Sequence, residues 1–166
     1  LVVGPSASGI QIAQELQSAG RNVTLSVGEH VRLPRTYRGL DILKLMDCAG
    51  IFDHTIHDVD DLNRVRRLPS MQLIGSPTHD TISLNSLQSS GVEIVGRSMG
   101  ARDNCVQLSG SLSNVCQLAD LKMNRLLRTL DDWIDQSDVR DICSGVYELA
   151  PTRLPDTPCL SLDLKD

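Results

Sequence analysis

The first thirty residues of this 166-residue chain constrain its fold more than any other segment. An all-apolar run at residues 1–3 is typical of a buried parallel strand, and a glycine-containing turn follows at residues 4–9. Apolar residues then recur at helical spacing over residues 10–19, and a β-branched run follows at residues 22–27. Strand, turn, helix and strand in this order predict a βαβ unit and therefore a parallel sheet.

The turn occupies the position of the dinucleotide fingerprint GxGxxG, with Ser6 in place of the middle glycine. Gly4 permits a sharp turn, Ser6 is small enough for a diphosphate to approach the backbone, and Gly9 lets the helix pack closely. The diphosphate would lie on the backbone N–H groups at the helix start. A glycine-rich turn without a ligand is the alternative. The candidate cofactor-binding residues of the turn are Gly4, Pro5, Ser6, Ala7, Ser8 and Gly9.

The residues after the second strand are expected to distinguish NADP from NAD. An acidic residue there accepts hydrogen bonds from the ribose 2′-OH, whereas arginine accommodates a 2′-phosphate. Ser26 could hydrogen-bond a phosphate, and the following loop holds three arginines, at Arg32, Arg35 and Arg38. Glu29 would repel a phosphate that it faced. The pattern favours NADP, with NAD as the alternative and a solvated loop as the other role for the arginines.

The remaining chain continues an α/β pattern. Helices are expected at residues 40–49, 58–68, 84–88 and 113–135, and strands at 71–74, 92–95 and 105–108. A hairpin turn is expected at residues 100–104. The predicted fold is a three-layer, Rossmann-like dinucleotide-binding domain over residues 1–149, with a parallel sheet, a β-hairpin and a long C-terminal helix. Residues 150–166 are rich in proline and indicate a connector.

Composition excludes several classes of protein. The net charge is −5, from 21 acidic and 16 basic residues, which argues against a nucleic-acid binder. No apolar run approaches the 18 or so residues of a membrane-spanning helix. The five cysteines are scattered without a CxxC pair, which favours reduced thiols and a cytoplasmic location. One Trp, two Tyr and one Phe leave an aliphatic core.

Other polar residues carry weaker signals. His54 and His57 have HxxH spacing, but without a third ligand they are expected in a polar loop rather than a metal site. His30 and His79 are expected at the surface. Cys116 is expected to be a small core residue on the long helix.

The motif GPSASG fits the GxSxSG variant of the NADPH-binding site in flavin-dependent monooxygenases, a family that includes the flavin-containing and Baeyer–Villiger types. The stretches VTLSVGEHVRLPRTYRGLDI, RLPSMQLIG and LADLKMNRLLRTLDDWI resemble a bacterial branch of that family, labelled flavoproteins of cation transport or FAD-dependent oxidoreductases. The resemblance covers nearly the whole chain. The sequence departs from the branch at Glu29, where an arginine is common.

The resemblance implies that this chain is the nucleotide-binding domain of a longer protein. The turn would hold the NADPH diphosphate, and Ser26 and the loop arginines would meet the adenosine phosphate. NADPH would reduce FAD, and the reduced flavin would activate O2 to oxygenate a small-molecule substrate. Neither the FAD fingerprint nor the return to the FAD domain is in the sequence, so we expect an NADPH domain that begins at Leu1 and contains no catalytic residue.

Two other functions are compatible with the sequence. One is a reductase of the pyridine-nucleotide–disulfide type, which does not oxygenate. The other is a non-catalytic, nucleotide-sensing module linked to cation transport. Apolar surface on the long helix, expected to contact an FAD domain, also predicts self-association.

Overall fold

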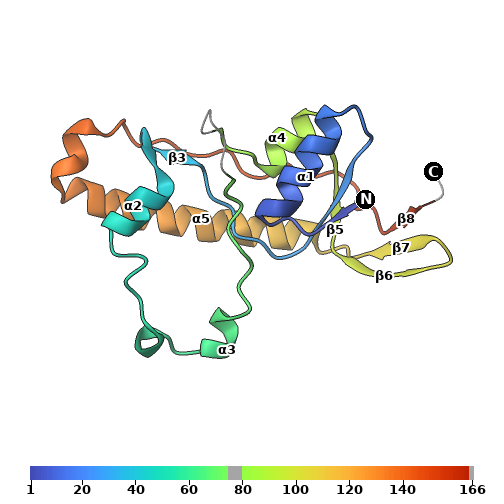
Figure 1. The fold of residues 1–166 in the computed structure, drawn as a ribbon, viewed down its shortest axis with the longest axis horizontal. Coiled ribbons are helices and arrows are strands. Elements are labelled where there is room, and N and C mark those ends of the chain that lie inside the picture. The colour runs from blue at the N-terminus through green and yellow to red at the C-terminus, as the bar shows by residue number, and fades with distance from the viewer. Residues whose placement is uncertain (75–79, 165–166) are drawn as a thin grey trace.

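A short parallel sheet of three strands lies at the centre of the first hydrophobic core. The computed structural model describes residues 1–74 and 80–164. Strands β1 (Val2–Val3), β2 (Thr24–Val27) and β5 (Glu93–Gly96) pair in parallel in the order β1-β2-β5. Helix α1 (Ala7–Ser18) connects β1 to β2, and α4 (Leu84–Ser89) precedes β5 and contacts α1 (Figure 1). The predicted βαβ start and parallel sheet are therefore confirmed.

The hairpin is tighter than the sequence predicted. Strand β6 (Ser98–Arg102) pairs antiparallel with β7 (Cys105–Leu108), and β8 (Ser161–Asp163) pairs with the other edge of β7. The turn consists of Asp103 and Asn104, whose φ values of 52° and 63° are left-handed. Asp and Asn tolerate this conformation in two-residue hairpins. The turn lies within the expected segment 100–104 but is shorter, because residues 100–102 extend β6.

Helix α5 (Leu112–Asp135) is a single long helix that contributes to two hydrophobic cores. Its N-terminal part packs against the sheet core through Leu112 and Cys116. Its C-terminal part, from Met123 to Ile134, packs against a second core. Each buried aliphatic side chain there contributes about 1.5–3 kcal/mol. The predicted long helix and the core position of Cys116 are confirmed, although Leu118 of the apolar stripe is exposed.

The second core is built by the segment after β2. Strands β3 (Thr36–Tyr37) and β4 (Leu40–Asp41) form a small antiparallel pair, followed by α2 (Ile42–Cys48). The Asp41 side chain accepts hydrogen bonds from the backbone N–H groups of Leu43 and Lys44 and so begins the helix. The helix predicted over 40–49 starts later because its first two residues pair in a strand. A 3₁₀ turn, η2 (Asp138–Ile142), follows α5.

The segment that follows α2 projects from the rest of the fold and forms less regular structure than predicted (Figure 1). The helix expected over 58–68 is reduced to η1 (Ile56–Asp58) and α3 (Leu62–Val65). No residue between 52 and 68 is buried, so no apolar face stabilises a longer helix. The strand expected at 71–74 is reduced to one parallel bridge between Val31 and Met71.

The proline-rich end of the chain contacts the rest of the fold. The buried Thr152 donates its backbone N–H to Asp120 of α5, at 2.7 Å. Asn85 of α4 bonds Pro151 and Arg153 on either side of it. The predicted connector is therefore docked along α4 and α5. No helix in the part of the chain described combines the length and apolar character needed to cross a bilayer.

Candidate functional site

The turn between β1 and α1 needs glycine at both ends. Gly4 has a φ of +103°, and its N–H donates to the carbonyl of Ser26 at 3.0 Å. A Cβ atom on Gly9 would lie 1.8 Å from the carbonyl oxygen of Gly4. No side chain fits at that distance, so α1 approaches β1 as closely as it does only because residue 9 is glycine. This is the close packing that the sequence predicted for Gly9.

The start of α1 presents backbone donors beside open space. Ser6 is the N-cap residue, and its side chain makes no capping hydrogen bond. The first N–H groups of a helix lack intrahelical partners, and the helix dipole makes this end positive. Ala7 and Ser8, in the first turn, are at least partly exposed, and a Cβ atom on Gly4 would meet no atom within 4 Å. The turn can therefore accept an anion. Pro5, next to Gly4, is buried and anchors the turn in the fold.

Gln72, which the sequence did not identify, braces this turn. Its side-chain Nε2 donates to the carbonyl of Pro5 at 2.6 Å, and its backbone N–H donates to Val31 at 2.8 Å. Only 3% of the residue is exposed, and its Oε1 atom has no hydrogen-bond partner in the described structure. Gln72 thus joins the turn to the segment that leaves β2. No local pattern marks a glutamine for such a long-range role.

Ser26 is held between strands. Its hydroxyl donates to the carbonyl of Gly96 at 3.0 Å and accepts the N–H of Ser98 at 2.9 Å. The residue is 1% exposed. Ser26 therefore links β2 to the end of β5, and its predicted contact with a phosphate stays a prediction.

The three loop arginines have acidic partners within the protein, so the alternative of a solvated loop is wrong. Arg32 pairs with Asp120 of α5 and also donates to the carbonyl of Ala150. Arg35 pairs with Asp41 at 2.6 Å. The loop remains a predicted phosphate-binding segment, but its charges are already balanced.

Arg38 shows the same kind of pairing. It pairs with Asp131 at 3.2 Å and donates to the carbonyl of Ser144 at 2.8 Å. Arg32 and Arg38 are both buried, and a buried cation is stable only with such partners.

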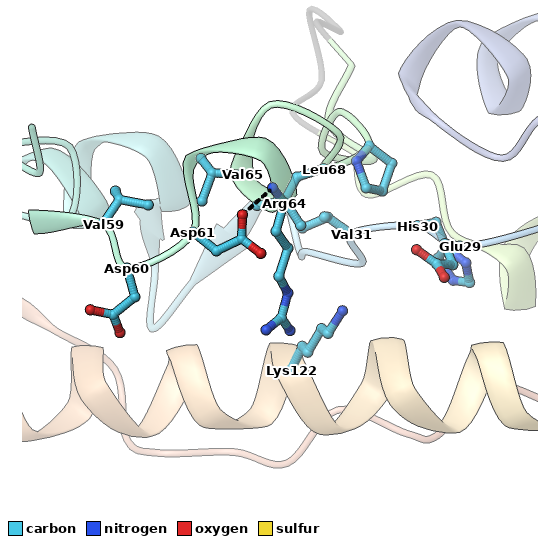
Figure 2. Close-up of a pocket in the computed structure, with 11 residues that line it drawn as sticks. Glu29, His30, Val31, Val59, Asp60, Asp61, Arg64, Val65, Leu68 and Lys122 are labelled. Atoms are coloured by element: carbon cyan, nitrogen blue, oxygen red, sulfur yellow. Dashed lines mark hydrogen bonds between the residues drawn. The ribbon is translucent and has the colours of Figure 1, made fainter. Parts of the chain in front are cut away.

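A cavity of about 440 Å³ opens where the chain leaves β2. Its walls come from this exit, from α3 and the residues that flank it, and from α5 (Figure 2). Glu29 lines the cavity and is exposed. Two cations also line it, Arg64 from α3 and Lys122 from α5. The sequence analysis missed both, because neither lies in a motif and they are far apart in the chain.

His30 is buried in the wall of this cavity, so the expected surface position is wrong. Its Nδ1 lies 2.9 Å from the carbonyl of Gly28, and its Nε2 has no hydrogen-bond partner in the described structure. Burial lowers the pKa of His30 below its usual value of 6.5, against a smaller raising effect of the Gly28 carbonyl. The imidazole is therefore neutral at physiological pH.

The other candidate residues contribute little here. His54 and His57 are exposed, and no group of metal-ligating side chains gathers within residues 1–74 and 80–164. His79 lies outside the described residues. The five cysteines are free thiols.

Comparisons of the chain with protein-family models, with curated proteins and with solved structures found no match. The resemblance to flavin-dependent monooxygenases therefore stays a prediction.

Proposed function

We propose that this chain binds a pyridine dinucleotide, with the diphosphate over the turn formed by residues 4–9. The observation that carries the proposal is the close contact of Gly9 with Gly4 beside an uncapped helix start. This geometry brings backbone N–H groups to the carboxyl end of the first strand of a parallel sheet. Ligands of open α/β sheets bind at the carboxyl ends of the strands.

The requirements of a diphosphate match the chemistry of the turn. Phosphate oxygens accept hydrogen bonds from unpaired N–H groups, and the positive end of α1 favours their charge. The open space beside Gly4 leaves room for the ligand to approach the backbone. In this proposal the sheet order β1-β2-β5 is one half of a Rossmann-like, three-layer domain.

The resemblance to flavin-dependent monooxygenases gives the proposed nucleotide site a role in the supply of reducing equivalents. Bound NADPH would provide a hydride to FAD, and the protein's contribution would be to hold and orient the nucleotide. The residues of this chain at the site would bind the nucleotide and support the turn. We assign none of them a chemical step. The flavoprotein monooxygenase activity rests on the resemblance of the sequence alone.

A substitution at the N-cap tests the proposal without weakening the fold. Ser6→Asp places a carboxylate where the diphosphate would lie, but Asp is a favourable N-cap residue and keeps α1 stable. We expect calorimetric titration to show NADPH or NADH binding to the wild type and at least about tenfold weaker binding to S6D. The melting temperature of S6D should match or exceed that of the wild type.

The matched control is Ser18→Asp, which introduces the same group at the other end of α1. S18D should bind the nucleotide like the wild type. Failure of the wild type to bind either nucleotide, or unchanged binding by S6D, would overturn the proposal.

A further inference from the structure

Two cations point into the cavity between α3 and α5, and neither has an acidic partner among the described residues. Arg64 extends from α3 and Lys122 from α5, and Figure 2 shows both reaching into the space between the two helices. Neither belongs to any of the ion pairs of the described residues. Both also line an adjoining cavity of about 430 Å³. Because like charges repel across a shared space, an anion between them would be favourable.

The carboxylates around the cavity have other positions. Asp61 accepts the backbone N–H of Arg64 at 3.0 Å and so caps α3. Asp60 lies apart from the two cationic groups in Figure 2, and Glu29 lies beside His30. None of these three carboxylates forms an ion pair with Arg64 or Lys122 among the described residues.

The rest of the lining is largely apolar. Val31, Val59, Val65 and Leu68 form walls around the charged pair. The volume of about 440 Å³ falls within the range of roughly 300–1,000 Å³ that is usual for small-molecule sites. A ligand that fits has an anionic end and an organic body that contacts the apolar walls.

We propose that this cavity binds an organic phosphate monoester, with its phosphate between Arg64 and Lys122. A dianionic phosphate balances two cations, whereas a carboxylate balances only one. His30 adds a polar group to the wall. With Nδ1–H donating to Gly28, its buried Nε2 keeps an unused acceptor within the described structure.

This anion site does not depend on the proposed dinucleotide site. The two are connected, because Gln72 contacts both Val31 in the cavity wall and Pro5 in the turn. Where both sites are occupied by one ligand, the monoester is the 2′-phosphate that distinguishes NADP from NAD. A separate phosphate ester is the other source of the same chemistry.

Titration with adenosine 2′-monophosphate and with inorganic phosphate, at low salt, tests the anion site. We expect Arg64→Gln and Lys122→Gln each to weaken binding of the nucleotide at least about tenfold, as loss of a charge-assisted hydrogen bond does. The matched controls are R66Q, at the end of α3, and R125Q, on α5. These remove the same charge outside the cavity and should change binding less than twofold.

The outcomes separate the possibilities. Absence of binding by both phosphate probes, or equal weakening in the control variants, overturns the proposal. An S6D protein that loses NADPH but retains adenosine 2′-monophosphate supports both sites independently. A wild type that binds the monophosphate through Arg64 and Lys122 but binds no dinucleotide retains the anion site and overturns the proposed function. If R64Q weakens the binding of NADP⁺ but not that of NAD⁺, the phosphate monoester is the 2′-phosphate of the dinucleotide. If the substitution leaves NADP⁺ and NAD⁺ with the same affinities as in the wild type, the monoester is a separate ligand.

Discussion

Two groups of cations in this fold differ in their partners. Arg32 and Arg38 are buried, and each has a carboxylate partner from α5. Arg64 and Lys122 line an open cavity, and neither forms an ion pair within the described residues. The first group stabilises the attachment of the loop to α5. The second group keeps its charge available to a ligand.

The position of a cation in a motif therefore does not decide its role. The loop arginines follow the second strand, where sequence reasoning expects a phosphate site. Their charges are paired with carboxylates within the fold, because a buried guanidinium without a partner would be costly. The cations that remain available come from outside the loop.

The buried pair should show the largest effect on stability. Asp120→Asn removes the charge that balances Arg32, whose side chain is 10% exposed, and leaves a buried cation unpaired. We expect a loss of about 3–5 kcal/mol in the free energy of unfolding. Urea unfolding followed by the fluorescence of Trp133, the single tryptophan, measures it.

Two further variants sharpen this result. Asp132→Asn, on the same helix and exposed, should change stability by less than about 0.5 kcal/mol. The double variant R32M/D120N removes both charges and should be more stable than D120N. A loss below about 1 kcal/mol in D120N would mean that the pair is not a stabilising element.

The same contrast explains what the sequence could predict. The β1–α1–β2 unit depends on neighbouring residues: glycine at 4 and 9, and periodic apolar residues between. The long helix depends on its own apolar stripe. Such local signals predicted these elements correctly. The helix expected at 58–68 had suitable charges but no buried face, and only four of its residues form α3.

The site itself depends on distant pairs. Arg32 and Asp120 are 88 residues apart, and Gln72 and Pro5 are 67 apart. Composition and spacing do not determine which acid a given arginine meets, nor that Lys122 faces the cavity with Arg64. The turn could therefore be predicted from the sequence, whereas the cavity beside it could not.

We expect His30, in the wall of the cavity, to lower the stability of the protein in acid. Its surroundings carry Asp120, Arg32, Lys122 and Glu29, and burial lowers its pKa in the folded state. Below pH 6.5 the unfolded chain binds a proton that the folded protein excludes, so stability falls as the pH decreases from 6.5 through the folded pKa. Well above pH 6.5 the imidazole is unprotonated in both states, so its titration no longer changes the free energy of unfolding.

Urea unfolding of His30→Gln at pH 7.5 and pH 5.5 measures this contribution. The loss of stability between the two values should be smaller in H30Q than in the wild type. His54→Gln, at an exposed histidine, should keep the wild-type dependence. Equal pH dependence in H30Q and the wild type would place the acid sensitivity in other groups.

Substitutions of Arg64 and Lys122 should have the smallest effect on stability. Arg64→Gln and Lys122→Gln break no ion pair of the described residues and remove a repulsion between like charges. We therefore expect each to change the free energy of unfolding by no more than about 0.5 kcal/mol. Added phosphate should raise the unfolding midpoint of the wild type but not of either variant, because a ligand that binds only the folded state stabilises it. If R64Q or K122Q instead costs as much stability as D120N, these cations support the fold in the same way as Arg32, and the contrast between the two groups is wrong.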